Sequence, residues 1–471
     1  MNWGAGVARR RFASTVADLG PYVPSLVADW LRDQPDARHR ALEGTLLFAD
    51  VSGFTRMTEM FATAGKVGAE HMAGLIDVLF EHLVSAAYDY GAGVIKYGGD
   101  AVLVLFEGEG HVRRGCRAAT EMQKVIEREG RMRTSRGPVR LRMSVGVHSG
   151  RIEFLLVGGR YRELVVIGPA VTAIARMEAI AQPGQIVVSH ATADALAAAG
   201  ERRPEVAREE GLLLRTEPDA ERLHAPLLEV DYGDLDLAVT MCTALRDCIM
   251  SGAIDSEHRR VTTGFIKFSG ADELLAREGP EALTAAVDRI VTAAQDAAAA
   301  NEVTLLGSDI YADGGKLMMI SGAPRQLGHD EDRMLATARS VVGSGGPLPL
   351  RGGVNSGRAF TGSSGPHYRR TYSVNGDCVN LAARLMEHAP AGEVLTSGHV
   401  IKRATGSFVV TAVAPFAVKG KRDPVQAFAV GHSFERRDVA ATAEPMIGRE
   451  AEIAMLLEAA ADAAAGRGRV V

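Results

Sequence analysis

The chain has 471 residues, of which 46% are hydrophobic and 24% charged, the composition of an ordinary globular protein with room for two or three domains. Its formal net charge of -5 gives no electrostatic basis for binding nucleic acid. Four cysteines without zinc or disulfide spacing favour a reducing compartment, so we expect a cytoplasmic protein.

Residues 1–40 contain three consecutive arginines but no apolar run long enough for a signal peptide or a membrane span. The stretch 26–31 predicts a short helix that packs against the first domain. We therefore interpret residues 1–40 as an N-terminal helical segment rather than a targeting element.

The apolar residues 46–49 predict a short buried strand that ends at Asp50, and Ser52-Gly53 predicts a turn into a helix near Thr55. This pattern suits a metal-bound polyphosphate, because the carboxylate holds a cation while main-chain N–H groups face the anion. It is also an ordinary turn and cap signal, so the motif alone leaves both interpretations open.

A second carboxylate, Asp100, lies at the tip of a predicted hairpin. Residues 94–97 and 101–106 predict two strands joined tightly through two glycines, and residues 60–90 predict the helix that precedes them. Two carboxylates that share a site repel one another unless cations neutralise them. A nucleoside triphosphate bound with two Mg²⁺ ions would meet that need.

The motifs FADVSGFT and KYGGDAVLVLF together resemble the first catalytic half of the class III nucleotide cyclases. The resemblance is strongest to the soluble, bicarbonate-responsive adenylyl cyclases and their bacterial relatives. Diguanylate cyclases also use a Gly-Gly-acid hairpin on a related fold, but they act as two identical domains and lack the unequal halves described below.

The first domain is predicted to span residues 41–199. After the hairpin, the pattern predicts a helix at residues 112–129 and a strand pair at residues 141–158. Residues 164–171 then lead into a helix that contains Thr172 and Arg176, and a strand at residues 185–189 closes the domain. The order βαββαβ places helices on one face of an antiparallel sheet, which is a ferredoxin-like α+β fold. Residues 200–258 are interpreted as a linker with one strand at 211–214 and a helical pattern at 237–250.

A second copy of the domain is predicted over residues 259–435. LRMSVGVHSGRIEFLLVG recurs as LRGGVNSGRAFTGSSG, and TLLFADVSG recurs faintly as VTTGFIKFSG, which pairs Asp50 with Lys267. With only two copies, this is a duplication rather than a repeat array. We therefore expect two ferredoxin-like cyclase domains packed as an intramolecular pseudo-dimer, and so a chain that is a monomer.

The two copies carry complementary groups. The acids Asp50 and Asp100 belong to the first copy, whereas Asn380 and Arg384, four apart on one face of a helix, belong to the second. An arginine can hold charge that develops on a phosphorane, and an asparagine can orient a ribose. A helix cap and a surface arginine would look alike, so the complementarity is what predicts one composite site between the halves.

The resemblance implies an adenylate cyclase that converts ATP to 3′,5′-cyclic AMP and pyrophosphate by attack of the ribose 3′-oxygen on the α-phosphorus. It makes Asn380 and Arg384 the catalytic residues, and it assigns Asp50, Asp100 and Val51 to a site for two Mg²⁺ or Mn²⁺ ions. One ion would lower the pKa of the 3′-hydroxyl, and the other would hold the β- and γ-phosphates. The implied phosphate-binding residues are Ser52, Gly53, Phe54, Thr55 and Lys419.

Base selection departs from the family pattern. In the soluble adenylyl cyclases a lysine and a threonine of the second half bind adenine; Ser373 keeps the hydroxyl, but the lysine position falls on Gly307 or Ser308. Asp309 lies close enough in sequence to accept from the adenine amino group. ATP is therefore favoured over GTP, with a guanylate cyclase as one alternative and a catalytically weak nucleotide- or anion-sensing regulatory module as another.

The regulatory site of the family is matched in part. Lys96 matches the lysine of the bicarbonate site, whereas Arg176 stands one position later than the family's arginine. An anion such as bicarbonate between Lys96 and Arg176 is therefore a hypothesis.

Residues 436–471 contain the sequence IGRE followed by a predicted amphipathic helix. This segment resembles the entrance to an AAA-like or STAND-type ATPase module, so we expect the chain to be cut from a longer protein whose C-terminal ATPase-like module is missing. No complete Walker A motif is present, and no ATPase function is inferred.

Overall fold

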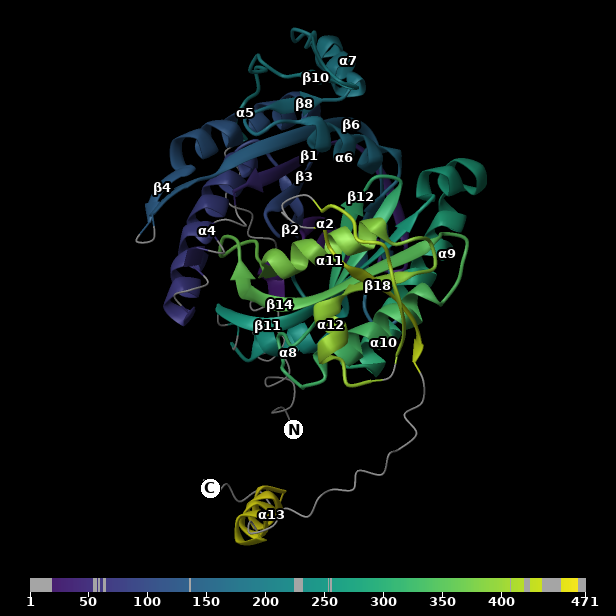
Figure 1. Ribbon diagram of the computed structural model, residues 1–471. Helices are drawn as coiled ribbons and strands as arrows, with labels where there is room; N and C mark the ends of the chain where they lie inside the picture. The colour runs from purple at the N-terminus through teal and green to yellow at the C-terminus, as the bar shows by residue number, and fades with distance from the viewer. Residues whose placement is uncertain are drawn as a thin grey trace, which may run out of the picture.

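The computed structural model describes residues 19–53, 57, 60, 61, 65–134, 137–223, 232–252, 254, 256–406, 408–418, 424–433 and 450–464. Within this part of the chain the strands form two eight-stranded sheets and one two-stranded ribbon. In Figure 1 the first sheet with its helices, coloured purple to teal, lies mainly above the second, coloured teal to yellow. Two α+β halves are therefore confirmed.

The first half contains eight strands in its sheet: β1 (His39–Ser52), β2 (Gly93–Gly98), β3 (Ala101–Glu107), β6 (Arg142–Val157), β7 (Glu163–Ile167), β8 (Ile186–Val188), β9 (Val206–Arg208) and β10 (Gly211–Leu213). Its helices are α4 (Gly65–Tyr88), α5 (His111–Glu129), α6 (Pro169–Ile180) and α7 (His190–Ala198). The strand order is β2-β3-β1-β6-β8-β10-β9, with β7 paired to β6. The separate ribbon pairs β4 (Arg131–Thr134) with β5 (Gly137–Arg140).

The second half repeats this arrangement with β11 (Glu257–Ser269), β12 (Thr304–Tyr311), β13 (Gly314–Ser321), β14 (Leu350–Ser364), β15 (Thr371–Asn375), β16 (Val394–Ser397), β17 (Phe408–Ala412) and β18 (Ala427–Ser433). Its helices are α9 (Ala271–Ala300), α10 (Asp330–Val342), α11 (Asp377–His388) and α12 (Gly398–Arg403). The order β12-β13-β11-β14-β16-β18-β17, with β15 on β14, matches the first sheet strand for strand. The duplication expected from the sequence is thus present in the topology.

Three details of the sequence prediction were wrong. Each sheet is mixed rather than antiparallel, because β6 and β8 are parallel, as are β14 and β16. The expected strand pair at 141–158 is the single strand β6, whose residues 142–155 pair continuously with β1, so no turn interrupts it. The first strand continues through Asp50 to Ser52 for the same reason, since β6 supplies a partner for every residue.

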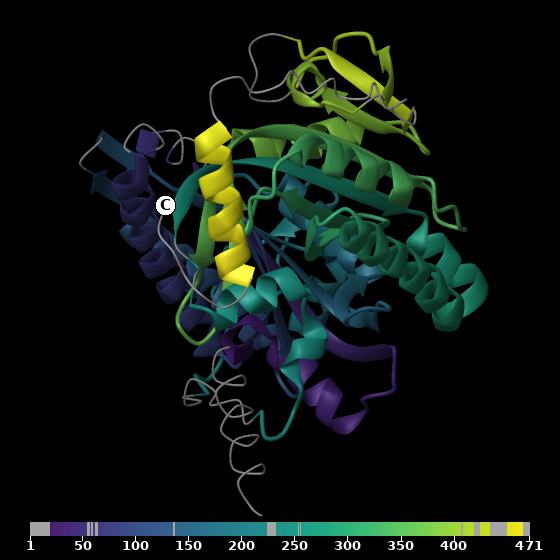
Figure 2. The same cartoon turned by 90° about the horizontal axis from the view of Figure 1, so that it is seen from below.

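The other described elements are η1 (Gly20–Tyr22), α2 (Ser25–Asp33), η2 (Leu237–Thr240), α8 (Thr243–Met250) and α13 (Glu450–Ala464). Leu26 and Val27 of α2 share one apolar core with Leu245 and Ile249 of α8, so these distant segments lie on the same side of the molecule (Figure 2). Among the residues described, none of the helices combines the length and the apolar character needed to cross a lipid bilayer.

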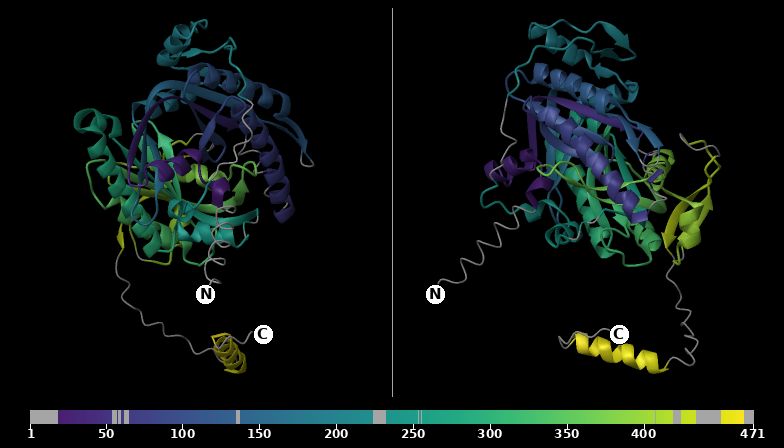
Figure 3. Two further views of the ribbon diagram at one scale, coloured as in Figure 1. Left: turned by 180° about the vertical axis from the view of Figure 1, so that it is seen from behind. Right: turned by 90° about the vertical axis from the view of Figure 1, so that its left-hand side faces the viewer.

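The two halves, which Figure 3 shows from behind and from the side, share an apolar core. Ile95 and Phe154 of the first half belong to the same buried cluster as Ile310 and Val374 of the second. Arg369 adds polar contacts, because its guanidinium donates to the main-chain carbonyls of Val94 and Ile95, each at 3.2 Å. Strand β2 is thereby fixed against the second half, just before the hairpin that carries Asp100.

Candidate active site

The two acids of the first half lie on neighbouring strands. Asp50 in β1 is paired with Ala101 in β3, and Asp100 directly precedes β3 in the turn from β2. The main-chain N–H of Val51 donates to the Asp100 carbonyl at 2.9 Å and so fixes the turn. The Val51 side chain is fully buried, so only its main chain can face a bound ion.

The electrostatics of this pair fit a divalent cation. The pKa of Asp100 is raised to about 7. The main cause is burial, which disfavours the charged carboxylate, and the second is repulsion by the nearby Asp50 carboxylate. No group of three or more His, Cys, Asp or Glu side chains that could hold a metal lies among the described residues. Mg²⁺ needs no such cage, since it is commonly held by one or two carboxylates plus substrate phosphates and water. Asp50 and Asp100 match that donor set.

A cleft of about 230 Å³ between the halves contains Asp100 together with Asn380. The first half lines it with the hairpin residues 97–100, and the second half lines it from β12, β13, β15 and α11. The predicted adenine-binding residues lie in the same cleft: Gly307, Ser308, Asp309 and Ser373. Residues 97–100 of the first half and residues between 265 and 383 of the second half thus surround one space.

The two glycines of the hairpin permit this close approach. A Cβ atom at Gly98 would lie 3.1 Å from a carboxylate oxygen of Asp309, and one at Gly99 would lie 3.1 Å from Oδ1 of Asn375. Gly99 also has a φ of +73°, in the left-handed region that side-chain-bearing residues disfavour. Larger residues at either position would push the two halves apart at the cleft.

Lys316, a charged residue of β13, lines the cleft although it was not among the residues predicted from the sequence. Its Nζ lies 3.0 Å from Oδ2 of Asp309. Burial opposes the charged form of Lys316, but the Asp309 carboxylate outweighs it, so the pKa of Lys316 is raised. The alternation of β13 would have placed Lys316 on one face of the sheet, although not opposite Asp309.

The cleft also has an apolar wall. Phe265, Met318 and Val379 line it beside the polar groups of β12 and β13. A flat, largely apolar body with a few hydrogen-bonding edges, such as a purine base, suits such a lining.

Asn380 and Arg384 lie one turn apart on α11, but only Asn380 lines the cleft. The Arg384 side chain is 41% exposed, and its Nη1 lies 3.0 Å from Oε2 of Glu387. Arg384 therefore does not line the cleft and instead forms an ion pair along its own helix.

The predicted phosphate-binding residues are described in part. Ser52 ends β1, where its hydroxyl donates to the Arg142 carbonyl at 3.3 Å. Gly53 follows with a φ of +100° and lies against the main chain of Arg140. Phe54, Thr55 and Lys419 lie outside the described residues.

The pseudo-symmetric counterpart of the site carries different chemical groups. Lys267 takes the place of Asp50, with its Nζ 3.7 Å from the centre of the Tyr311 ring. Thr172, which corresponds to Asn380, donates its hydroxyl to Asp272 at 2.6 Å and accepts the main-chain N–H of Asp313 at 2.7 Å. Lys267 would repel a metal ion, and the nearby acids Asp272 and Asp313 would repel a phosphate. These charges oppose the binding of a second nucleotide.

The two residues of the bicarbonate hypothesis are not brought together. The Lys96 ammonium lies 3.0 Å from Glu163 and 2.9 Å from Ser308 in a separate cavity. Arg176 is more than half exposed on the surface, and its nearest carboxylate is Glu210 at 3.8 Å. Each cation already faces a carboxylate of its own.

A family described as the adenylate and guanylate cyclase catalytic domain matches this chain twice, over residues 38–217 and 254–431. Adenylate cyclase type 10 of Oryctolagus cuniculus is 24% identical over 418 residues, which cover 80% of this chain and 26% of that protein. Its counterpart in Mus musculus is 26% identical over 184 residues, or 37% of this chain and 11% of that protein. The chain thus aligns with about a quarter or less of the length of these relatives.

Among solved structures, a class III adenylyl cyclase-like ATP-binding protein from Pseudomonas aeruginosa superposes with a TM-score of 0.60. The superposition covers 85% of this chain and 93% of that chain at 13% identity. This likeness shows that both halves, and not one alone, share a known tandem fold.

Proposed function

The chain belongs to the adenylate and guanylate cyclase catalytic domain family, and we propose that it is an adenylate cyclase that forms 3′,5′-cyclic AMP and pyrophosphate from ATP. The observation that carries this proposal is the single cleft that receives Asp100 from the first half and Asn380 from the second. Asp50 stands beside Asp100, so acids and transition-state groups from unequal halves can act on one triphosphate.

In this proposal each half supplies part of the chemistry. Asp50 and Asp100 would hold Mg²⁺ or Mn²⁺, which supplies charge neutralisation and acidifies a bound hydroxyl when present. Asn380 orients the ribose through its side-chain amide, and Arg384, one helical turn further along α11, holds charge that develops on the α-phosphate. Ser52 and Gly53, where β1 ends, would bind the phosphates through their main-chain N–H groups.

We assign base recognition to Lys316 and Asp309, with Ser373 beside them. A lysine donor and a carboxylate acceptor 3.0 Å apart can pair with the acceptor and donor that adenine presents on its Watson–Crick edge. Guanine presents the same two functions in reverse order, so a guanylate cyclase is the alternative within the family. The similarity to proteins named adenylate cyclase type 10 favours ATP.

Replacing Lys316 by methionine is expected to lower kcat/KM for ATP about tenfold, mainly through KM, because one hydrogen bond from a charged donor is lost. Lys316→Gln keeps a donor and should retain more activity. Lys124→Met, which removes a half-exposed lysine of a surface ion pair, is the control. Unchanged KM values for both ATP and GTP in Lys316→Met would exclude Lys316 from base recognition.

The direct test is to measure cyclic AMP and cyclic GMP formed by the purified chain with Mg²⁺ and with Mn²⁺. Cyclic AMP in excess supports the proposal, and cyclic GMP in excess supports the alternative. Binding of a fluorescent ATP analogue without turnover would instead indicate a nucleotide-sensing regulatory module. A cytoplasmic location and a monomeric state complete the proposal, since all four cysteines are free thiols and the site needs no second chain.

A further inference from the structure

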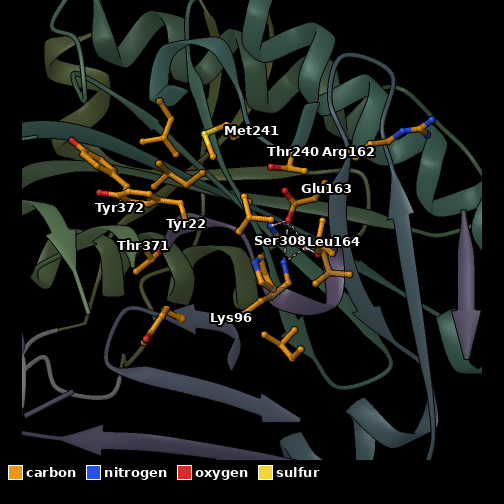
Figure 4. Close-up of a pocket in the computed structure, with 18 of the residues that line it drawn as sticks. Tyr22, Lys96, Arg162, Glu163, Leu164, Thr240, Met241, Ser308, Thr371 and Tyr372 are labelled. Carbon is orange, nitrogen blue, oxygen red and sulfur yellow. Dashed lines mark hydrogen bonds and ion pairs between the residues drawn. The ribbon is translucent and has the colours of Figure 1, made fainter. Parts of the chain in front are cut away.

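A second cavity, of about 140 Å³, lies between the halves next to the active-site cleft, and Glu163 is buried in it (Figure 4). Its side chain is 10% exposed. The carboxylate oxygen Oε1 accepts three hydrogen bonds: from Nζ of Lys96 at 3.0 Å, from the main-chain N–H of Ser308 at 2.7 Å and from the Ser308 hydroxyl at 2.8 Å. One carboxylate oxygen therefore gathers donors from both halves of the molecule.

These donors lie on two of the strands that line the active-site cleft. Lys96 lies in β2, four residues before Asp100, and Ser308 lies in β12, directly before Asp309. The Lys96 ammonium also donates to the Ser308 hydroxyl at 2.9 Å, which closes the network. Glu163 thus connects β2, which leads to Asp100, with β12, which carries Asp309.

The contact coincides with an irregularity of β12. The β12–β13 register shifts between Leu305 and Gly307, and such a bulge changes the direction in which the following side chains point. Gly307 has a φ of +147°, and a Cβ atom there would lie 3.3 Å from Oε1 of Glu163. The carboxylate therefore holds the bulge, after which Asp309 pairs with Lys316.

The charge of the cavity depends on Glu163. Within the described part of the chain it is the only acid that lines the cavity, whereas Lys96, Arg162 and Arg369 also line it. Figure 4 shows the Arg162 side chain pointing away from Glu163, and the Arg369 guanidinium donates hydrogen bonds to main-chain carbonyls. Without Glu163, the Lys96 ammonium, which is 12% exposed, would lack a carboxylate partner.

We propose that Glu163 is a positioning residue of the cyclase site, a built-in carboxylate that occupies the place beside Lys96 where a small soluble anion would otherwise bind. It keeps the Asp100 hairpin and the Asp309 strand in the arrangement that accepts the nucleotide. This proposal rests on the proposed function. It implies that the Lys96 ammonium is neutralised by Glu163 of the same chain rather than by an anion from solution. Bicarbonate at constant pH should then leave the wild-type activity unchanged.

The experiment compares Glu163→Ala and Glu163→Gln with the wild type in the presence and absence of formate, at fixed pH and ionic strength. Glu163→Ala is expected to lose about tenfold in kcat/KM, because hydrogen bonds to a charged group are removed from the network. Formate, a carboxylate small enough for the vacated space, should restore several-fold activity in Glu163→Ala and have no effect on the wild type. Glu163→Gln keeps an acceptor for Ser308 but loses the charge, so it should be impaired and should not respond to formate.

The matched control is Glu217→Ala, which removes an exposed glutamate from a surface ion pair with Lys124. It should retain wild-type activity and no formate response. Full activity of Glu163→Ala, or a loss that formate does not relieve although the variant melts at the wild-type temperature, would overturn the positioning role. If Glu163→Ala fails to fold, Glu163→Gln decides: wild-type kinetics in that variant would overturn the need for a negative charge.

Nucleotide binding separates this inference from the proposed function. If the wild type forms no cyclic nucleotide, the affinity for a fluorescent ATP analogue is measured on the same variants. Weaker binding by Glu163→Ala that formate restores supports the positioning role even though the cyclase proposal has failed. Equal affinity in all variants overturns it.

Discussion

Substituting Asp100 by asparagine is expected to lower the rate of cyclic nucleotide formation about a thousandfold, since several kcal/mol of charge stabilisation by the bound cations would be lost. The amide has nearly the same shape as the carboxylate, so the hairpin and its hydrogen bond from Val51 are retained. Turnover of saturating ATP with Mg²⁺ and with Mn²⁺ measures the effect. A rate within tenfold of the wild type would exclude Asp100 from metal binding.

The same variant should be more stable than the wild type when no metal is present. Burial and Asp50 raise the pKa of Asp100 to about 7 in the folded protein, above the ordinary value of 3.8. The folded state therefore holds the proton more tightly, and the associated stability is present below about pH 4 and is lost as the pH rises through about 7. At pH 8, Asp100→Asn removes the unfavourable charge and should stabilise the metal-free protein by about 2 kcal/mol.

Thermal unfolding at pH 8, with and without Mn²⁺, checks this expectation. The wild type should gain stability from Mn²⁺, whereas Asp100→Asn should gain less, because a metal ligand has been removed. Asp194→Asn is the control, since Asp194 lies in an exposed ion pair with Arg203. A metal-free melting temperature of Asp100→Asn below that of the wild type would contradict the electrostatic account of this pair.

Replacing Arg384 by alanine is expected to cost about 3 kcal/mol in transition-state stabilisation, by analogy with the loss of one oxyanion donor. The effect should fall on kcat rather than on nucleotide affinity, because Arg384 pairs with Glu387 until charge develops in the cleft. Steady-state kinetics together with the affinity for a fluorescent ATP analogue separate the two terms.

Arg32→Ala provides a matched control for Arg384→Ala. Arg32 is also about half exposed, at 44%, and also pairs with an acid three positions away on its own helix, Asp29. Arg32 is not among the residues that line the cleft. Loss of activity in both variants would point to a general effect on the fold, and a wild-type rate in Arg384→Ala would remove Arg384 from the mechanism.

Much of the architecture was predictable because the signals are local. The Gly-Gly-Asp turn predicts a hairpin from the two residues that form it, and β2 and β3 meet as expected. The internal repeat predicted two similar halves, and the strand orders of the two sheets agree. Asp100 and Asn380 were selected by residue type and position, and the structure brings them into one cleft.

Other features depend on partners that are distant in the sequence. The full length of β1 and β6 follows from their mutual pairing, which no local pattern of either strand specifies. The meeting of Lys316 with Asp309 depends on the bulge in β12, because a register shift of one residue changes the face on which a side chain lies.

The residues alone identify the chemical groups that the chain offers: acids in one half, an amide and a guanidinium in the other, and at position 96 a lysine that the family resemblance paired with Arg176. That Lys96 faces Glu163 rather than Arg176 follows only from the folded arrangement of the chain. The physical reason is that a buried cation requires a carboxylate within a few ångströms, and that distance is set by how the two halves pack.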